Sequence, residues 1–285
     1  MRTTRQIVFA EGLVDSANPQ PVDVLLDLFE PDEDLTGGAL PLAVMIHGGG
    51  FTAGSRNHPK MQLFGEEFAR QGYLAIAIDY RLRPDDPVLS GQFADALDRL
   101  NVSGSVRDGI NAQLTALEDT LRAIEFAEDY AAANEFTIDG IALLGPSAGA
   151  LTAINFAYAL DDLGVSVPDV GAVVGLWGGI GLGNTSAITL DEAPIIMIHG
   201  TDDTVVPFSA SQRIADRATA IGLPNELIAN VGAGHSFSDN EIFDLEWMPG
   251  SGISQARRVM DFVNVALLAG DCLRAQGVID GCDLP

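Results

Sequence analysis

The feature that most constrains the fold is a regular alternation between short apolar runs and longer amphipathic segments. The apolar runs have the length of single buried strands, and the segments between them repeat apolar residues at helical spacing. Strands separated by helices pair in parallel through right-handed crossovers, which leaves helices on both faces of the sheet. We therefore predict one α/β domain over residues 1–285, built on a mostly parallel central sheet.

The expected elements follow one another in a simple order. Strands are expected at residues 22–30, 40–47, 73–80, 138–145, 169–179, 193–200 and 224–231. Helices are expected at residues 59–72, 111–134, 148–160, 209–222 and 254–270. The segment 83–110 breaks the alternation because it is polar, acidic and rich in Gly, Pro and Ser. A small lid insertion beside a functional site and a plain surface excursion are both compatible with it.

The chain has a large excess of acidic residues, with 15 Lys and Arg against 40 Asp and Glu, and a formal net charge of −25. Nucleic acid and anionic membranes require basic side chains, so we expect neither as a partner. No apolar run approaches the roughly 18–20 residues of a membrane span. A solvated acidic surface explains the charge, and steering of cationic substrates has no independent support in the sequence.

The N-terminus and the cysteines bear on location. Residues 1–19 lack the apolar core of a signal peptide, which favours the cytoplasm. Cys272 and Cys282 lie close together near the C-terminus, and their spacing suits a disulfide and two free thiols equally well. A disulfide would point to an oxidising compartment, so secretion or a periplasmic location after removal of a leader stays open. Neither cysteine lies near a histidine in the sequence, which argues against a zinc site.

A serine stands between two glycines where a predicted strand meets a predicted helix. The segment Gly145–Gly149 reads GPSAG and fits the pattern G-x-S-x-G in the strand–turn–helix setting of a nucleophile elbow. The sharp turn would display the Ser147 hydroxyl, and the small flanking residues would let strand and helix approach each other. Gly and Ser are common, so the pattern on its own also suits a small residue without a chemical role.

A glycine-rich loop, HGGGFTAGS, follows the strand expected at 40–47. Its backbone N–H groups at Gly48, Gly49 and Gly50 can approach a ligand without side chains in the way. One such donor aimed at a developing oxyanion contributes about 3–4 kcal/mol. A glycine-rich turn with a purely structural role is the alternative to an oxyanion site. A phosphate-binding loop is a third interpretation, but no lysine and no G-x-G-x-x-G spacing supports it. His47 is expected to hold this loop through side-chain hydrogen bonds.

Of the four histidines, His235 is best placed to act as a general base, in a small-residue loop between the last predicted strand and the final helix. A serine hydroxyl becomes a nucleophile when such a base takes its proton, and a carboxylate must orient the base. A loop histidine without a role is the alternative. His58 is expected to be solvated, and His199 is expected to pack at the end of its strand.

Two adjacent carboxylates, Asp202 and Asp203, follow the strand expected at 193–200. We choose Asp203 as the partner of His235 because it opens the run D-x-x-V-P, which leaves Asp202 as a turn residue. The reverse assignment stays open. About one strand–helix unit separates Ser147 from Asp203 and Asp203 from His235, so all three are expected to meet at the carboxyl ends of parallel strands.

These motifs together resemble the α/β-hydrolase superfamily. More narrowly, they are similar to bacterial carboxylesterases and lipases with an HGGG motif, including the hormone-sensitive-lipase-like and feruloyl-esterase-like groups. The resemblance extends from residue 47 to residue 237 and implies Ser147 as nucleophile, His235 as general base and Asp203 as its partner. The matching stretches are HGGGFTAGS, IDYRL, GPSAGA, HGTDDTVVP and GAGHSF.

The resemblance also implies that the backbone N–H groups of Gly49, Gly50 and Ala148 form an oxyanion hole. In the DYRL stretch it implies a structural role, with Asp79 or Arg81 anchoring the nearby loops.

The chain departs from the hormone-sensitive-lipase-like pattern in two places. RPDD follows DYRL instead of AP, and only 46 residues precede the glycine loop, which leaves little sequence for a cap. An accessible site with a minimal cap is therefore expected, which argues against a long-chain lipase.

The expected function is that of a serine carboxylesterase. It would act on small-molecule esters of short to medium acyl length, as a monomer or homodimer, without a metal or organic cofactor. A feruloyl or acetyl-sugar esterase, a serine peptidase on the same fold and a non-catalytic binding member are the alternatives.

Overall fold

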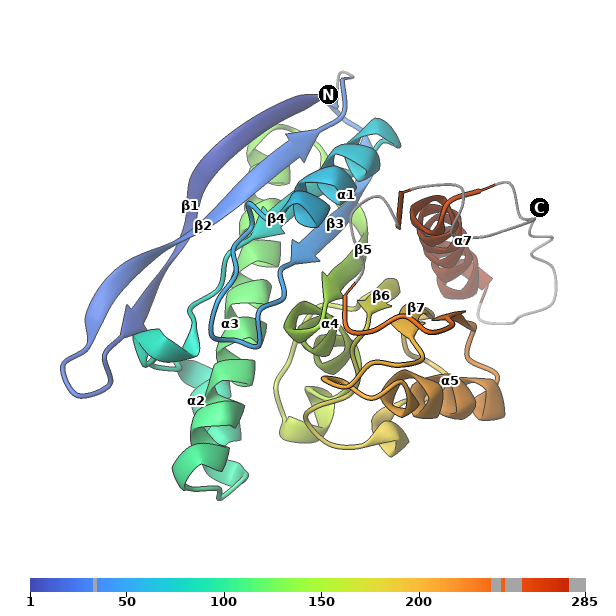
Figure 1. Cartoon of the computed structure of the whole chain (residues 1–285). Coiled ribbons are helices and arrows are strands. Elements are labelled where there is room, and N and C mark those ends of the chain that lie inside the picture. Colours follow the sequence, from blue (N-terminus) through green and yellow to red (C-terminus); the bar gives the residue numbers. More distant parts are fainter. Residues whose placement is uncertain (33–34, 237–241, 244–252, 277–285) are drawn as a thin grey trace.

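The computed structural model describes residues 1–32, 35–236, 242–243 and 253–276. For residues 268–276 it describes the backbone alone. Eight strands form one sheet in the order β1-β2-β4-β3-β5-β6-β7-β8 (Figure 1). The pairs β1–β2 and β2–β4 are antiparallel, and every later pair is parallel. The strands are β1 (Arg2–Val14), β2 (Gln20–Glu30), β3 (Ala39–Ile46), β4 (Leu74–Ile78), β5 (Thr137–Pro146), β6 (Ala172–Leu176), β7 (Ile195–Gly200) and β8 (Asn225–Asn230). The prediction of a mostly parallel α/β sheet is confirmed.

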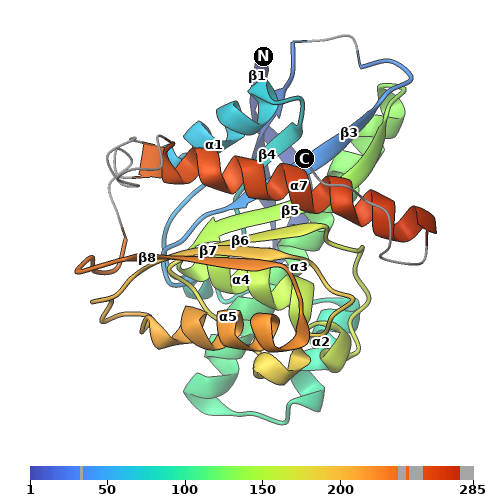
Figure 2. The same cartoon turned by 90° about the vertical axis from the view of Figure 1, so that its right-hand side faces the viewer.

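Helices cover both faces of the sheet, as the alternation of strands and helices predicts (Figure 2). One face carries α1 (Pro59–Arg70) and α7 (Gln255–Gln276). The other carries α2 (Gly91–Arg99), α3 (Gly104–Ala133), α4 (Ala148–Tyr158) and α5 (Ser209–Ile221). Three single turns of 3-10 helix lie between these elements, η1 (Arg83–Asp85), η2 (Asp161–Leu163) and η3 (Thr185–Ala187).

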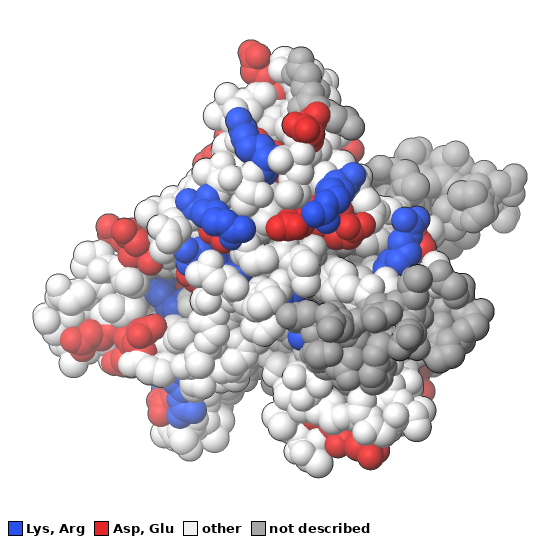
Figure 3. Space-filling model, turned by 45° about the horizontal axis from the view of Figure 1, so that its top comes forward, with Lys and Arg blue, Asp and Glu red and all other residues white. Residues whose placement is uncertain are grey.

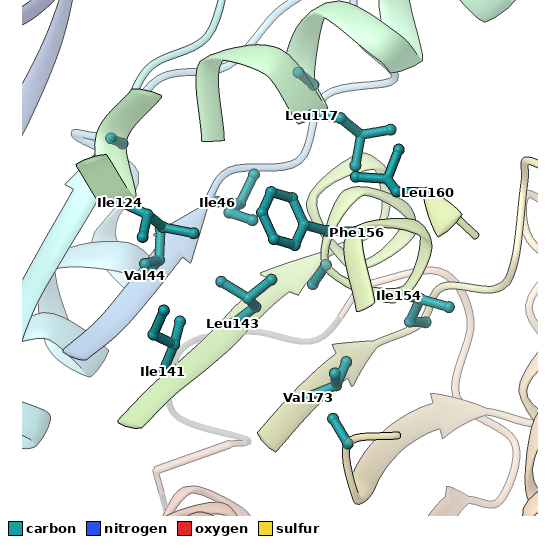
Figure 4. Close-up of a cluster of buried hydrophobic side chains, with 14 of the residues drawn as sticks. Val44, Ile46, Leu117, Ile124, Ile141, Leu143, Ile154, Phe156, Leu160 and Val173 are labelled. Carbon is teal, nitrogen blue, oxygen red and sulfur yellow. The ribbon is translucent and has the colours of Figure 1, made fainter. Parts of the chain in front are cut away.

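The two layers of core follow from the alternation of side chains along each strand. In β3, Val44 and Ile46 face the layer of α3 and α4, whereas Met45 faces α1 and α7. Figure 4 shows the ring of Phe156 pointing from α4 toward Ile46 and Leu143. Strands buried on both faces appear in the sequence as continuous apolar runs, which is why the central strands could be predicted.

The first strand, β1, was not predicted. It is a 13-residue edge strand in which only Gly12 is fully buried, and it pairs with β2 alone. An edge strand that is held mainly by backbone hydrogen bonds to one neighbour does not need a run of apolar side chains. The sequence of β1 therefore gives little indication of a strand. The segment 83–110 also contains more regular structure than expected, because it forms η1, α2 and the first turns of α3. Its role as a lid stays a prediction.

The face of the molecule seen in Figure 3 has no large continuous area of basic side chains among the described residues. There, Lys and Arg side chains lie among Asp and Glu side chains and uncharged residues. Within the described residues, no helix combines the length and the apolar composition needed to cross a bilayer. A cytoplasmic location stays a prediction.

A buried arginine ties several loops to the end of β4. The Arg81 guanidinium donates to the carboxylates of Asp119 and Glu118 in α3, at 2.8 Å for each. It also donates to the backbone carbonyls of Leu13 and Val88, at 3.1 and 2.9 Å. These contacts connect β1, α3 and the segment before α2. They confirm the expectation that a residue of the DYRL stretch anchors the nearby loops.

We expect Asp119→Ala to lower the free energy of unfolding by about 3 kcal/mol, because it leaves the buried Arg81 charge with only one carboxylate and opens a polar void. Urea unfolding at neutral pH measures the difference. Asp129→Ala, at an exposed position of the same helix, is the matched control and should change stability by less than about 0.5 kcal/mol. Equal effects of the two substitutions would contradict a stabilising role for the buried cluster.

A cavity of about 700 Å³ lies at the edge of the sheet where β6, β7 and β8 begin. Its lining includes the end of α4 and the turns that precede these three strands. Burial, assisted by the negative charges of Asp191, Asp161 and Asp162, raises the pKa of Glu192 in this lining to about 7. The cavity therefore contains a carboxyl group that titrates near neutral pH.

Glu192→Gln is expected to stabilise the protein at pH 8 relative to the wild type and to have little effect near pH 4.5. The folded state holds the Glu192 proton up to about pH 7, whereas the ordinary glutamate pKa is 4.5. The wild type therefore loses stability as pH rises through this window, and glutamine removes that loss. Urea midpoints of both proteins at the two pH values measure the difference. A gain in stability that is equal at both pH values would contradict the raised pKa.

Candidate active site

Loops from five parallel strands meet at the carboxyl edge of the sheet, which is the edge where open α/β sheets bind ligands. Each loop follows directly on its strand in the sequence. These loops carry the glycine run after β3, Ser147 after β5, Trp177 after β6, Asp203 after β7 and His235 after β8.

Ser147 sits in a strained turn between β5 and α4. Its backbone has φ 52° and ψ −116°, a conformation that residues other than glycine rarely adopt. The N–H of Ser147 donates to the carbonyl of Leu176 at 2.8 Å, and α4 begins at the next residue. At Gly149 a Cβ would lie 2.0 Å from the carbonyl oxygen of Ile46, so only glycine lets α4 start this close to β3. This is the geometry of a nucleophile elbow.

The structure brings Ser147, His235 and Asp203 together. Nε2 of His235 lies 3.0 Å from Oγ of Ser147, and Nδ1 of His235 lies 2.7 Å from Oδ2 of Asp203. Because a carboxylate only accepts, Nδ1 carries the proton and Nε2 is free to accept from the serine hydroxyl. The His235 ring also packs edge-on against Trp177, with 6.5 Å between ring centroids.

Asp203 is buried and receives hydrogen bonds on both carboxylate oxygens. Besides the contact with His235, its Oδ1 accepts from the backbone N–H groups of Val205 and Val206 at 2.8 and 2.9 Å. Burial alone would raise the pKa of Asp203, but the hydrogen bonds from His235 and these two amides bring the pKa below its ordinary value. The carboxylate is therefore ionised at neutral pH.

Asp202 lies in a different environment from its neighbour. Its side chain is exposed and accepts from Oγ1 of Thr201 at 3.2 Å, and its N–H donates to the carbonyl of Ala233. The geometry thus favours Asp203, not Asp202, as the partner of His235.

The glycine loop runs beside the serine turn. A Cβ on Gly48 would lie 3.5 Å from Cβ of Ser147, and Gly49 has φ +116°, where a Cβ would lie 1.9 Å from the carbonyl oxygen of Ala53. Across the described residues, the backbone N–H groups of Gly49, Gly50 and Ala148 donate to no other group. These amides are the three that the resemblance assigns to an oxyanion hole, and they are available to a ligand.

His47 contributes to the shape of this loop, as the sequence predicts. Its ring is buried, stacks on Tyr80 at 4.2 Å between centroids, and places Nδ1 2.6 Å from the carbonyl oxygen of Gly48. Burial lowers the pKa of His47, so the neutral ring donates from Nδ1 to that carbonyl. The Tyr80 hydroxyl donates to the carbonyl of His47 at 3.1 Å.

Two residues of the site, Trp177 and His199, were not predicted from the sequence. His199 was expected only to pack at the end of its strand, and it is indeed buried. However, its Nε2 also lies 3.1 Å from Oδ2 of Asp203. The spacing of four residues between His199 and Asp203 in HGTDD is a signal that could have linked them. His58 is exposed, as expected, and caps α1 by accepting from the N–H of Lys60.

The cysteines give no further information on the site. Cys282 lies outside the described residues, and the side chain of Cys272 is also outside them, so the disulfide stays a prediction. Among the described residues, no group of three or more His, Cys, Asp or Glu side chains is arranged to hold a metal ion.

The sheet order, the strained serine turn and the Ser–His–Asp contacts together have the arrangement of the α/β-hydrolase fold. The chain is similar to the BD-FAE family, whose model matches residues 26–98. That stretch is about a quarter of the chain, and it contains the glycine loop but none of Ser147, Asp203 and His235.

Solved structures of esterase 2 from Thermogutta terrifontis match nearly the whole chain. The form phosphorylated by paraoxon has a TM-score of 0.60 and 21% identity, with 97% of this chain and 95% of that chain covered. The apo form has a TM-score of 0.59 and 22% identity, with 95% and 94% covered. At this level of identity the likeness establishes the fold.

Curated relatives match over shorter stretches. Non-reducing polyketide synthase atr1 of Stereocaulon alpinum is 30% identical over 147 residues, which is 51% of this chain and 5% of that protein. Secreted lipase 5 of Gibberella zeae is 29% identical over 177 residues, which is 59% of this chain and 30% of that protein. The matches thus span only a small part of the length of these relatives.

Proposed function

We propose that the protein is a serine carboxylesterase that hydrolyses small-molecule esters of short to medium acyl length through an acyl-enzyme. The observation that carries this proposal is the continuous hydrogen-bond chain from Ser147 through His235 to Asp203, with distances of 3.0 and 2.7 Å. It lies at the carboxyl edge of the sheet, beside free backbone donors. A serine hydroxyl, a base and an orienting carboxylate in this order are the parts that acyl transfer requires.

In the acylation step, Oγ of Ser147 attacks the ester carbonyl carbon while Nε2 of His235 takes the hydroxyl proton. The carbonyl electrons move to oxygen, and the resulting oxyanion accepts hydrogen bonds from the N–H groups of Gly49, Gly50 and Ala148. The ionised Asp203 stabilises the imidazolium that forms. When the intermediate collapses, the alcohol leaves with the proton from His235, and the acyl group stays on Ser147.

In the deacylation step, water gives a proton to His235 and attacks the acyl carbon. A second oxyanion forms at the same backbone donors and collapses, and the proton on His235 returns to Oγ of Ser147 as the acid leaves. Every proton moves within hydrogen-bond distance of the imidazole. The residues therefore complete the cycle without a metal or an organic cofactor.

Two observations support small esters as substrates. The connection from β6 to β7 contains only η3 as regular structure, so a large cap is not built there. The structurally similar esterase of Thermogutta terrifontis has been solved with propionate and with butyrate bound. A feruloyl or acetyl-sugar esterase is a second candidate within the same chemistry, because the sequence motifs also resemble those of the feruloyl-esterase-like group.

Hydrolysis of p-nitrophenyl esters from acetate to palmitate tests the proposal, together with feruloyl and acetylated sugar esters. We expect rates to peak at short acyl chains. A peak at palmitate would contradict the short acyl preference, and a preference for feruloyl or acetyl-sugar esters would favour the second candidate. Size-exclusion chromatography of the same sample tests the accompanying proposal that the protein is a monomer or homodimer.

A further inference from the structure

The Asp203 carboxylate is held between two histidines. His235 approaches Oδ2 from the partly exposed side of the site, with 19% of its side chain exposed. His199 approaches the same oxygen from the core, where its side chain is fully buried, with Nε2 at 3.1 Å. The catalytic cycle proposed above assigns a role to His235 but none to His199.

The partners of His199 determine which ring nitrogen carries the proton. Nε2 faces the carboxylate of Asp203 and also the backbone carbonyl of Val206, at 2.9 Å. Both groups only accept hydrogen bonds, so Nε2 must be an N–H donor shared between them. The ring therefore adds a donor to a carboxylate that already receives hydrogen bonds from His235, Val205 and Val206.

The second nitrogen of His199 is set by a buried serine of α5. Nδ1 lies 2.7 Å from Oγ of Ser211, which is also 3.1 Å from the carbonyl oxygen of Gly178. If the hydroxyl donates to Nδ1, the ring is neutral with its proton on Nε2. The alternative, donation to Gly178, requires a doubly protonated ring. The shorter distance to Nδ1 favours donation from the hydroxyl to the ring, which leaves the ring proton on Nε2.

His199 is also held by packing. The ring of Phe208 contacts it edge-on at 5.8 Å between centroids, with an angle of 88° between the planes. Ser211, Phe208 and the carbonyl of Val206 thus contact the ring in addition to Asp203. A ring held in this way presents its Nε2–H to Oδ2 in one fixed direction.

From these contacts we infer that His199 is a positioning residue for the reaction proposed above, an inference that rests on that proposed function. Its Nε2–H holds Oδ2 of Asp203 from the core, so that the carboxylate keeps the orientation in which it receives Nδ1–H of His235. The Ser211 hydroxyl keeps the His199 proton on Nε2. Without His199 the carboxylate would lose one of its four N–H donors, and the carbonyl of Val206 would lose its hydrogen bond from the ring.

Three variants separate positioning from simple packing. His199→Gln retains an N–H donor near the place of Nε2, His199→Asn has a side chain too short to reach Asp203, and Ser211→Ala removes the hydroxyl that selects the tautomer. Tyr158→Phe is the matched control, because it removes a different buried hydrogen bond, from the Tyr158 hydroxyl to the carbonyl of Ala193.

We expect His199→Asn to lower kcat by about 10- to 100-fold with KM changed less than about twofold, the size of a lost hydrogen bond to a charged group. His199→Gln should stay within about fivefold of the wild type, and Ser211→Ala should lose about three- to tenfold. Tyr158→Phe should keep the wild-type kcat. If His199→Asn does not fold, the results for Ser211→Ala decide the question.

A second readout does not depend on ester hydrolysis. The chain has four histidines, so proton NMR of protein with ¹⁵N-labelled histidine can follow the Nδ1–H signal of His235, assigned by its loss in His235→Ala. This signal should shift or broaden in His199→Asn and Ser211→Ala and persist in His199→Gln. An unchanged signal together with unchanged kcat in these two variants would overturn the inference. A wild type without esterase activity, but with the expected NMR changes, would instead overturn the proposed function and leave the positioning contact standing.

Discussion

Ser147→Ala is expected to lower kcat for a short p-nitrophenyl ester by about a million-fold, the loss seen when a serine hydrolase triad loses its nucleophile. Alanine removes the oxygen that forms the acyl-enzyme but leaves the turn, His235 and the backbone donors in place. The remaining rate would come from direct attack of water on the bound ester, assisted by the groups that stay in place. Initial rates at saturating ester, with protein at high concentration to detect the residual activity, measure the effect.

Two controls make the Ser147 result specific. Ser105→Ala, at an exposed position near the start of α3, should keep wild-type kinetics. A fluorophosphonate should label the wild type and Ser105→Ala at a single serine, identified as Ser147 by peptide mass spectrometry, and should not label Ser147→Ala. Equal rates in Ser147→Ala and the wild type would remove Ser147 from the mechanism.

Asp203→Asn is expected to lower kcat by about 10⁴-fold while the protein stays folded. Asparagine has nearly the same shape, but its amide can donate to Nδ1 of His235 and so favour the tautomer in which Nε2 carries the proton. In that tautomer the imidazole cannot accept the proton of Ser147. Steady-state kinetics, with urea unfolding as a check on stability, measure the effect.

The neighbouring carboxylate provides the matched control for this substitution. Asp202→Asn makes the same chemical change one residue away, at an exposed side chain that contacts Thr201 instead of His235. We expect kcat within about twofold of the wild type. A large loss in Asp202→Asn together with a small loss in Asp203→Asn would reverse the assignment of the two residues.

The central part of the fold could be predicted because burial imposes a pattern on the sequence. β3, β4 and β5 contain runs of buried apolar residues, and the expected strands overlap the observed ones within a few residues. β1 has no such run, because an edge strand exposes most of its side chains. The start of α3 was placed too late for a similar reason, since its first turns, from Gly104, are exposed and polar.

The candidate site could be predicted in its main parts because its residues follow strands directly in the sequence. Ser147 and the glycine loop also belong to short patterns whose backbone conformations depend on glycine, as at Gly49 and Gly149. For His199 the sequence offers a weaker signal, its spacing of four residues from Asp203 in HGTDD. A histidine at the end of a buried strand is compatible with packing alone. Only the distance from His199 to Asp203 shows that its ring also contacts the carboxylate of the site.

The sequence by itself therefore determined the central parallel strands of the sheet, its helical layers and the strand ends at which a serine, an aspartate and a histidine lie. These features depend on local periodicity and on glycine positions, and both are encoded within short segments. The run D-x-x-V-P favoured Asp203 over Asp202, but only the tertiary structure shows the contact of Asp203 with His235 and the contact of His199 with the same carboxylate from the core. Hydrogen bonds between the ends of different strands depend on distances between residues that are far apart in the sequence. A local sequence pattern does not specify these distances, which are set only when the chain has folded.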